Sequence, residues 1–390
     1  MQFVFAGGDP LVKELISERV QKFNIQYPEY QINEISSGSG PYLDFVKTQD
    51  AIGEFPDILD SRNTAIWVEG DKLAELPDSV VALLNAPPTY NDRYYVAPLS
   101  LPLPSLGIFY NKALFDDLNL EEPTTYGEFE VLCDTIAENG LVPMVQGGKD
   151  IWHIGFLWSH LWNEMVTREN PNWIVDKHAG RVSFTDENVQ MMIKKYASLY
   201  EKNYIDKDWL VTPDNQLVSY LLTEKAAMFF SGSWMINQVA EADPSFELGW
   251  FPLPDQSGDI SLVYATSLAG FALSKEASLN PDKVACFEAF TQFWYADENY
   301  IPYIEAVVAI PATNTNEPIE YKSSFPDEFN LALSQAVFES PEWSTFRDEN
   351  TLPSGFRNIT YTSFQNMIKN GRSSEELGVL LDQYWTIKLQ

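Results

Sequence analysis

The chain has 390 residues, of which 45% are hydrophobic and 21% are charged. This length exceeds what one hydrophobic core serves and fits two domains, and the ordinary charge content argues against long disordered segments. The formal net charge of −31 at pH 7 argues against nucleic acids and anionic lipid surfaces as partners, because their phosphate groups would be repelled. The charge suits an uncharged ligand, although a need for solubility explains it equally well.

The N-terminal part of the chain alternates between strand and helix patterns. Strands are expected at residues 3–6, 30–35 and 56–60. After the first strand, Asp9 suits the N-cap and Pro10 the first position of a helix that continues to Pro28. Strands alternating with helices form a parallel sheet, and ligands of such sheets bind beyond the carboxyl ends of the strands. These ends correspond to residues 7–9, 36–40 and 60–63.

A second α/β block begins with a buried strand over residues 106–110. Thr125 and Glu128 have the spacing of a capping box and predict the start of a helix. Further strands are expected at 141–146, 227–230 and 248–251, with helices over 185–202 and around 218–222. The proline-rich segment 252–259 ends the block. A strand over 268–274 and a helix from Asn280 follow it.

Cysteine usage and hydropathy bear on the compartment. Cys133 and Cys286 each lie on an apolar stripe with helical spacing, so we expect two small buried side chains and no disulfide. A protein without disulfides can be cytosolic or extracellular, so the cysteines do not identify the compartment. No apolar run reaches the roughly 18 residues of a membrane helix. Met1-Gln2 leads directly into the first strand, so we expect a chain trimmed of its export signal and anchor.

Three motifs follow one another in the middle of the chain. They are Tyr95-Val96-Ala97-Pro98 in a strand, the Tyr110–Phe115 crossing and the Pro123–Phe129 helix start. Their order and spacing resemble those of family 1 extracellular solute-binding proteins of ATP-driven sugar importers, the class that contains maltose-binding protein. The resemblance therefore rests on three consecutive matches rather than on one.

The resemblance extends over nearly the whole chain. Residues 223–228 followed by Gly232-Ser233-Trp234 are similar to a family motif, although Thr223 or Glu224 replaces its usual glycine. Further segments that match the family are 251–254, 270–274 and 371–377.

The resemblance implies an α/β fold of the two-lobed periplasmic-binding-protein type II class, with a ligand cleft between the lobes and three interlobe crossings. The expected lobes comprise residues 1–109 with 264–311, and 110–263 with 312–390. A neutral oligosaccharide would bind in the cleft, the lobes would close by hinge motion, and the sugar would pass to the membrane permease of an ABC transporter. We expect a monomer without cofactor or metal. It would be lipid-anchored at the extracellular face of the bacterial cell membrane, with the periplasm as the alternative compartment.

Aromatic residues are the first candidates for sugar contact. The chain has eleven tryptophans and nineteen tyrosines, whose flat faces stack on the apolar faces of sugar rings. Trp152 follows a predicted strand, and the family's counterpart of Trp234 stacks on a sugar. Asp150 and His153 flank Trp152 and could bind hydroxyls, although a lone histidine is more often an ordinary loop residue. Core packing is expected for at least one of Trp158 and Trp162, because they share a helix face.

Polar candidates lie on the strand-end loops of the first domain. They are Asp9, Ser37, Ser39, Asp60 and Asn63. Carboxylates accept hydrogen bonds from pairs of hydroxyls, which suits sugar diols. Asp9 has an alternative role as a helix N-cap, whereas Asp60 has none.

Two further candidates rest on a looser match to the family. Phe356 and Arg357 lie where the family has another ligand contact, with core packing as the alternative for Phe356. Trp67 is expected to pack within its apolar run.

Two other functions remain open, a glycoside-active enzyme and a solute-binding protein for a peptide or polyamine. A glycosidase needs two carboxylates across a cleft, but among 56 acidic residues such pairs do not distinguish an enzyme from a binding protein. The sequence contains no nucleophile elbow, phosphate loop or H-E-x-x-H motif. Three scattered histidines and two separated cysteines do not form a zinc site by themselves. We therefore expect no catalytic residues. Turnover of a bound oligosaccharide would favour the enzyme, and carboxylates in the cleft would favour a polyamine.

Overall fold

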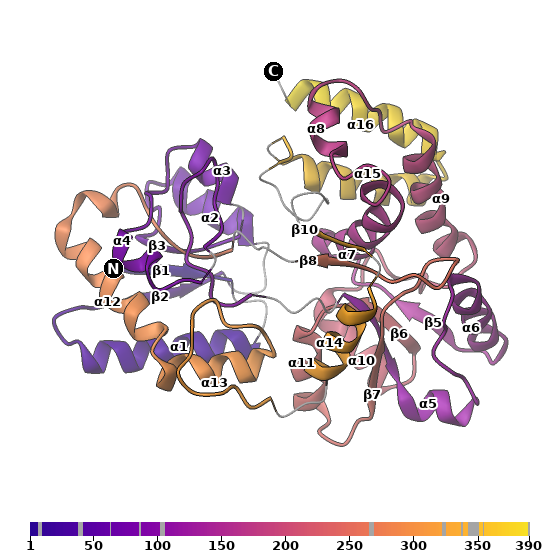
Figure 1. Cartoon of the computed structure of the whole chain (residues 1–390), viewed down its shortest axis with the longest axis horizontal. Coiled ribbons are helices and arrows are strands. Elements are labelled where there is room, and N and C mark those ends of the chain that lie inside the picture. Colours follow the sequence, from indigo (N-terminus) through magenta and orange to yellow (C-terminus); the bar gives the residue numbers. More distant parts are fainter. Residues whose placement is uncertain are drawn as a thin grey trace. The chain divides into compact units, whose positions relative to one another are not determined.

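The structure, a computed structural model, describes residues 1–6, 10–37, 42–62, 64–85, 87–101, 106–264, 269–321, 325–336, 338–341, 351–353 and 355–388. The chain divides into two compact α/β units (Figure 1). Unit 1 comprises Met1–Pro102 and Thr266–Lys322, and unit 2 comprises Leu103–Ala265 and Ser323–Gln390. Each unit has its own sheet and its own hydrophobic core.

Unit 1 is built on a four-stranded sheet in the order β2-β1-β3-β9. The strands are β1 (Gln2–Phe5), β2 (Asn33–Ser36), β3 (Ile58–Ser61) and β9 (Gly270–Leu273). The first three are parallel, as the sequence predicts, with Val4 aligned to both Ile35 and Leu59. β9 returns antiparallel to β3. The described carboxyl ends of the parallel strands, at Ala6, Ser37 and Arg62, consequently meet at one edge of the sheet.

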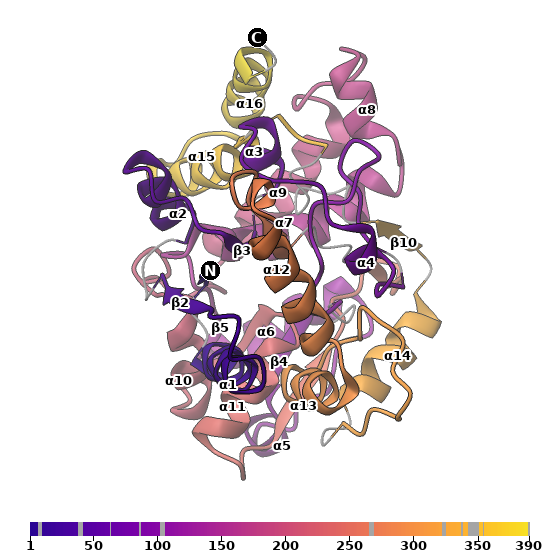
Figure 2. The same cartoon turned by 90° about the vertical axis from the view of Figure 1, so that its left-hand side faces the viewer.

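The helices of unit 1 cover this sheet. They are α1 (Pro10–Gln26), α2 (Tyr42–Ala51), α3 (Thr64–Glu69), α4 (Asp78–Val81), η3 (Ala277–Leu279), α12 (Pro281–Trp294) and α13 (Asp297–Val307). α12 lies over the strands, and its Phe290 ring is 6.0 Å from Phe3 and 5.4 Å from Phe271 (Figure 2). α1 lies beside α13, where the buried Arg19 Nε donates to the Asn299 carbonyl at 2.9 Å.

Unit 2 has a four-stranded sheet in the order β5-β6-β4-β7 and a two-stranded sheet, β10-β8. The strands are β4 (Gly107–Asn111), β5 (Val142–Val145), β6 (Ala226–Ser231), β7 (Leu248–Phe251), β8 (Ser261–Tyr264) and β10 (Phe338–Pro341). β5 and β6 are parallel, whereas β4 runs antiparallel to both β6 and β7. The loops that follow β5 and β6 therefore leave the same edge of the sheet.

Twelve elements of unit 2 are helical within the described residues, and α6, α9 and α10 match the helices expected from the sequence. They are α5 (Lys112–Asp117), α6 (Tyr126–Glu138), α7 (Ile151–Trp162), η1 (Asn163–Thr167), α8 (Trp173–His178), α9 (Glu187–Glu201), η2 (Asp214–Gln216), α10 (Leu217–Leu222), α11 (Trp234–Ala242), α14 (Phe325–Gln335), α15 (Phe356–Asn370) and α16 (Ser374–Lys388). Thr125 caps α6 as expected, since its hydroxyl accepts from the Glu128 N–H at 3.2 Å. The Glu128 carboxylate reaches back to the Thr124 N–H at 2.8 Å, one residue before the cap.

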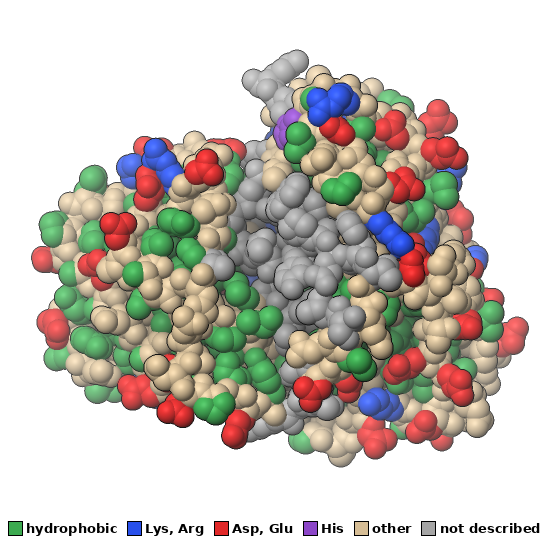
Figure 3. Space-filling view, in the orientation of Figure 1, with side chains coloured by type: hydrophobic (Ala, Val, Ile, Leu, Met, Phe, Trp, Pro, Cys, Tyr) green, Lys and Arg blue, Asp and Glu red, His purple; other side chains and the backbone are tan. Residues whose placement is uncertain are grey.

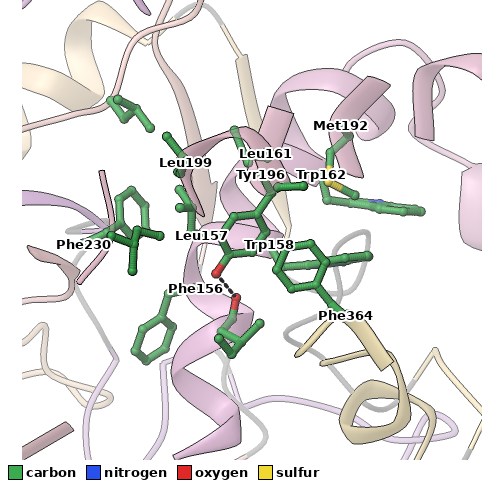
Figure 4. Close-up of a cluster of buried hydrophobic side chains, with 14 of the residues drawn as sticks. Phe156, Leu157, Trp158, Leu161, Trp162, Met192, Tyr196, Leu199, Phe230 and Phe364 are labelled. Atoms are coloured by element: carbon green, nitrogen blue, oxygen red, sulfur yellow. Dashed lines mark hydrogen bonds between the residues drawn. The ribbon is translucent and has the colours of Figure 1, made fainter. Parts of the chain in front are cut away.

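Several of the clustered tryptophans are buried in the core of unit 2. Trp158 and Trp162 are fully buried on α7 and stack at 6.4 Å, which confirms the core-packing expectation (Figure 4). Trp158 also meets the Phe364 ring edge-on at 5.5 Å, and the Tyr196 hydroxyl donates to the Ile154 carbonyl at 3.2 Å. The density of tryptophans in this part of the sequence therefore reflects packing as well as surface chemistry.

The two cysteines and Trp67 are buried, as the sequence predicts. Cys133 and Cys286 are buried and free. Within the described ranges, no helix combines the length and apolarity needed to cross a bilayer. Trp67 is 4% exposed and packs against the Phe55 ring at 5.4 Å. Acidic side chains are spread over the face of both units that Figure 3 shows, rather than gathered in one region.

Candidate functional site

Two loops at one edge of the unit 2 sheet present aromatic side chains. The loop after β5 leads into α7, whose second residue is Trp152. The loop after β6 leads through Gly232 and Ser233 into α11, whose first residue is Trp234. Because β5 and β6 are parallel, both helices start at the same edge, and the two predicted tryptophans come together.

Phe156 lies between these two tryptophans. Its ring centroid is 5.3 Å from that of Trp152 and 5.0 Å from that of Trp234. Trp152 is 40% exposed, Trp234 is half-buried and Phe156 is 8% exposed. We call Trp152, Phe156 and Trp234 the aromatic surface. Sequence reasoning missed Phe156, although its position four residues after Trp152 on a helix could have revealed it.

Gly232 allows the Trp234 ring to fold back over the chain. A Cβ atom at this position would lie 2.1 Å from Cζ3 and 2.4 Å from Cη2 of that ring. Such distances are far below van der Waals contact, so any larger residue would displace the ring. The glycine in the family-like segment before Trp234 thus has a steric reason.

We expect Gly232→Ala to weaken binding of any ligand that stacks on Trp234 by about tenfold, or roughly 1.4 kcal/mol. The reason is displacement of the ring rather than loss of a contact group. Calorimetric titration would measure the effect. Gly127→Ala on α6 is the matched control, because its Cβ would meet nothing closer than 3.6 Å and should leave affinity unchanged. Equal affinities for the Gly232 variant and the wild type would show that the ring is not used.

A buried polar group supports the base of α7. His153 is 1% exposed and lies beneath the aromatic surface, 5.3 Å from the Phe156 ring. Its Nε2 is 3.5 Å from Asp214 Oδ1, and burial lowers the pKa of His153 to about 3, so the imidazole is neutral. Asp150 Oδ2 accepts from the Asp214 N–H at 2.8 Å, which ties the β5–α7 loop to η2. In this arrangement His153 packs beneath the aromatic surface. One carboxylate oxygen of Asp150 already accepts a hydrogen bond from the backbone of Asp214.

The two buried histidines of α7 should make unit 2 less stable in mild acid. Burial lowers the pKa of both His153 and His160 from 6.5 to about 3. The unfolded chain therefore takes up protons below about pH 6.5 that the folded chain does not bind. Stability is fully present above that pH and falls by roughly 1.4 kcal/mol per histidine per pH unit as the pH drops toward 3.

Urea unfolding at pH 7 and pH 5 would measure this difference. The double variant His153→Gln/His160→Gln serves as the control, since it lacks both titrating groups and should lose most of the pH dependence between these values. A variant with the same pH dependence as the wild type would contradict the assignment.

The polar candidates of unit 1 lie at the carboxyl edge of its own sheet. Asp60 is buried at the end of β3, and its Oδ2 lies 3.0 Å from Arg62 Nη2. The backbone N–H of Ala6 donates to the same oxygen, with an N···O distance of 3.5 Å. Arg62 has a side chain 47% exposed, and Asp60 beside it raises the pKa of the guanidinium. Ser37 follows β2, and its N–H donates to the Phe5 carbonyl at 3.2 Å. Asp9, Ser39 and Asn63 lie outside the described residues.

The ion pair changes the interpretation of Asp60. The sequence left this carboxylate without a structural role, but the structure provides a cationic partner that sequence reasoning missed. The exposed group at this edge is therefore the Arg62 guanidinium, whereas the Asp60 carboxylate lies beneath it. Tyr42 completes the edge by donating to the Val4 carbonyl at 3.3 Å.

Phe356 and Arg357 start α15 in unit 2. Phe356 is fully buried, with its ring 4.9 Å from Trp385 and 5.6 Å from Phe184, which favours the packing alternative for this residue. Arg357 is half-buried beside it.

The aromatic surface is suited to binding an apolar face of a ligand by ring stacking. It offers apolar ring faces with a neutral histidine behind them. Among the described residues, no group of three or more histidine, cysteine or carboxylate side chains could hold a metal ion.

The sequence matches the bacterial extracellular solute-binding protein family over residues 8–301. The chain belongs to this family. Among curated relatives of the family, a multiple sugar-binding protein of Streptococcus mutans is 26% identical over 255 residues, which make up 63% of this chain and 59% of that protein. The chain thus aligns with less than two thirds of this relative's length.

Solved structures of solute-binding proteins share the whole fold. A chitin oligosaccharide binding protein matches with a TM-score of 0.84 at 19% identity, covering 100% of this chain and 98% of the other. A sugar transporter from Bacillus licheniformis in complex with stachyose matches with a TM-score of 0.79 at 19% identity, covering 100% of both chains. These similarities confirm the expected α/β, two-lobed solute-binding-protein fold.

Proposed function

We propose that this solute-binding protein captures a neutral oligosaccharide and delivers it to the permease subunits of an ABC importer. The observation that carries the proposal is the aromatic surface. Trp152 and Trp234 present ring faces at a sheet edge, and such faces stack on the apolar sides of pyranose rings. The sugar ligands named for its relatives, chitin oligosaccharide and stachyose, support the same class of ligand.

In this proposal the sugar contacts both units. Trp234 and Trp152 stack on sugar rings, and sugar hydroxyl groups bind Asp150 and Arg62. The Asp60 carboxylate acts through Arg62, which it holds in place. Asp9, Ser37, Ser39 and Asn63 remain proposed contacts for further hydroxyl groups. Arg357 remains a candidate, while His153 and Phe356 act through packing.

The proposal includes a hinge where the chain passes between the two units. The structure divides the chain near residues 102, 265 and 322, so the expected boundaries at 109, 263 and 311 differ from it by a few to about eleven residues. The protein works as a monomer outside the cytoplasmic membrane, held there by a lipid anchor, and it does not alter the sugar. The permease and its ATPase are the protein partners.

Calorimetric titration with a panel of neutral oligosaccharides tests this function. Chitin oligosaccharides, xylo-oligosaccharides, raffinose and stachyose cover several linkages, with spermidine and a neutral peptide as probes of the alternatives. We expect at least one sugar to bind and to be recovered intact by chromatography after incubation. Binding of spermidine or peptide alone would contradict the sugar ligand, and cleavage above the protein-free control would indicate an enzyme.

A further inference from the structure

Helices α15 and α16 of unit 2 enclose an open groove that is separate from the aromatic surface. The two helices follow each other through a short turn at residues 371–373 and pack together (Figure 1). The groove has a volume of about 660 Å³. None of the aromatic surface residues lines it. It therefore needs an explanation of its own.

One wall of the groove is a row of uncharged polar side chains on α15. The row consists of Asn358, Thr362, Asn366 and Asn370, which recur every fourth residue and so share one helix face. At 1.5 Å per residue the row is about 18 Å long. In the part of the chain that the structure describes, the side chains of Asn358, Thr362 and Asn366 make no hydrogen bond. The Asn370 side chain donates to the backbone carbonyl of Asn366 at 2.7 Å.

The floor and the opposite wall combine apolar surface with further hydroxyl groups. Ser363 lines the groove at 8% exposure. Met367 and Leu377 are buried below. On α16, the half-buried Tyr384 adds an aromatic ring and a hydroxyl. The hydroxyl groups of Ser363 and Tyr384 thus line an open groove, where a ligand can hydrogen-bond to them.

Charge is confined to one end of this groove. Arg372 and Glu376 are its two ionised lining residues, and Glu376 Oε2 already accepts from the Ser373 N–H at 2.8 Å. The rest of the lining is neutral on a chain with a net charge of −31. An amide or hydroxyl both donates and accepts hydrogen bonds, as a sugar hydroxyl does.

We propose that the groove between α15 and α16 is a second binding site for neutral carbohydrate. A pyranose would face Tyr384 and the apolar floor, while its hydroxyls bind Ser363, Thr362 and the asparagine row. A peptide fits less well, because the walls are helix faces that offer side-chain amides and no free strand edge. The site goes beyond the proposed function and stands whether or not the aromatic surface binds sugar.

Equilibrium dialysis against chitohexaose, xylohexaose and stachyose tests the proposal by stoichiometry. Trp234→Ala weakens the first site without touching the groove, so binding that substitutions in the groove wall reduce further in this variant comes from the groove. We expect one of these sugars to bind Trp234→Ala in the millimolar range. Adding Asn366→Ala or Thr362→Val to that background should weaken the binding about tenfold, since each removes a hydrogen-bonding group from the wall.

Gln383→Ala is the matched control. Gln383 is an exposed amide next to Tyr384 on α16 and does not line the groove, so its removal should leave binding unchanged. Thermal unfolding would establish that all variants are folded. The proposal is overturned if Trp234→Ala binds none of the three sugars, if the wall variants bind as tightly as Gln383→Ala, or if a neutral peptide competes for the site more strongly than the sugars do.

Discussion

Replacing Trp234 by alanine should weaken oligosaccharide binding about thirtyfold or more, corresponding to roughly 2 kcal/mol. Trp234 is half-buried against Phe156, so its ring is held in place before a sugar arrives. Truncation removes the stacking face and leaves a gap that the neighbouring ring does not fill. Calorimetric titration of wild type and variant with the same sugar measures the difference, and thermal unfolding checks that the variant is folded.

Trp67→Phe is the control for this experiment. Trp67 is also a tryptophan but is 4% exposed in the core of unit 1, and phenylalanine keeps an aromatic ring against Phe55. Affinity should therefore not change. If both variants lost affinity equally, the aromatic surface would not be the binding site.

Saturating oligosaccharide should reduce the radius of gyration of the protein in solution. The proposed ligand contacts both units, so it binds a closed state better than an open one and shifts the population toward closure. Its expected contacts are Trp152 and Trp234 in unit 2 and the Asp60–Arg62 pair in unit 1. Small-angle X-ray scattering with and without sugar measures the change, and tryptophan fluorescence gives an independent signal because Trp152 is 40% exposed.

Arg62→Ala separates closure from binding. This variant keeps the aromatic surface in unit 2 but loses the half-exposed guanidinium in unit 1. It should still bind sugar, more weakly, with a smaller decrease in the radius of gyration than the wild type. An unchanged radius for the wild type at saturation would contradict a ligand that bridges the two units.

Patterns that depend on local geometry were predictable from the sequence. Alternating strand and helix signals predicted the parallel strands β1, β2 and β3, because each strand is a short apolar run ended by polar residues. Thr125 was identifiable as a cap from its spacing to Glu128, since capping involves only neighbours along the chain. Trp152 and Trp234 were candidates because each follows a predicted strand, and Trp234 also because its family counterpart stacks on a sugar.

Features that depend on contacts between distant segments were not predictable. Asp60 lacked an evident partner in the sequence, but β3 ends so that Arg62 turns back onto it. His153 was a candidate for binding hydroxyl groups, with an ordinary loop residue as the alternative. The structure instead buries it on α7 beside Asp214, more than sixty residues away in the sequence. The groove between α15 and α16 depends on how two helices pack, which a helical pattern alone does not specify.

A crystal structure of the protein with its tightest-binding neutral oligosaccharide tests the central claim most directly. The account predicts an intact sugar with pyranose rings stacked on Trp234 and Trp152, and hydroxyl groups hydrogen-bonded at the sheet edge of unit 1. A sugar bound away from the aromatic surface, with Trp152 and Trp234 free of contact, would contradict the account.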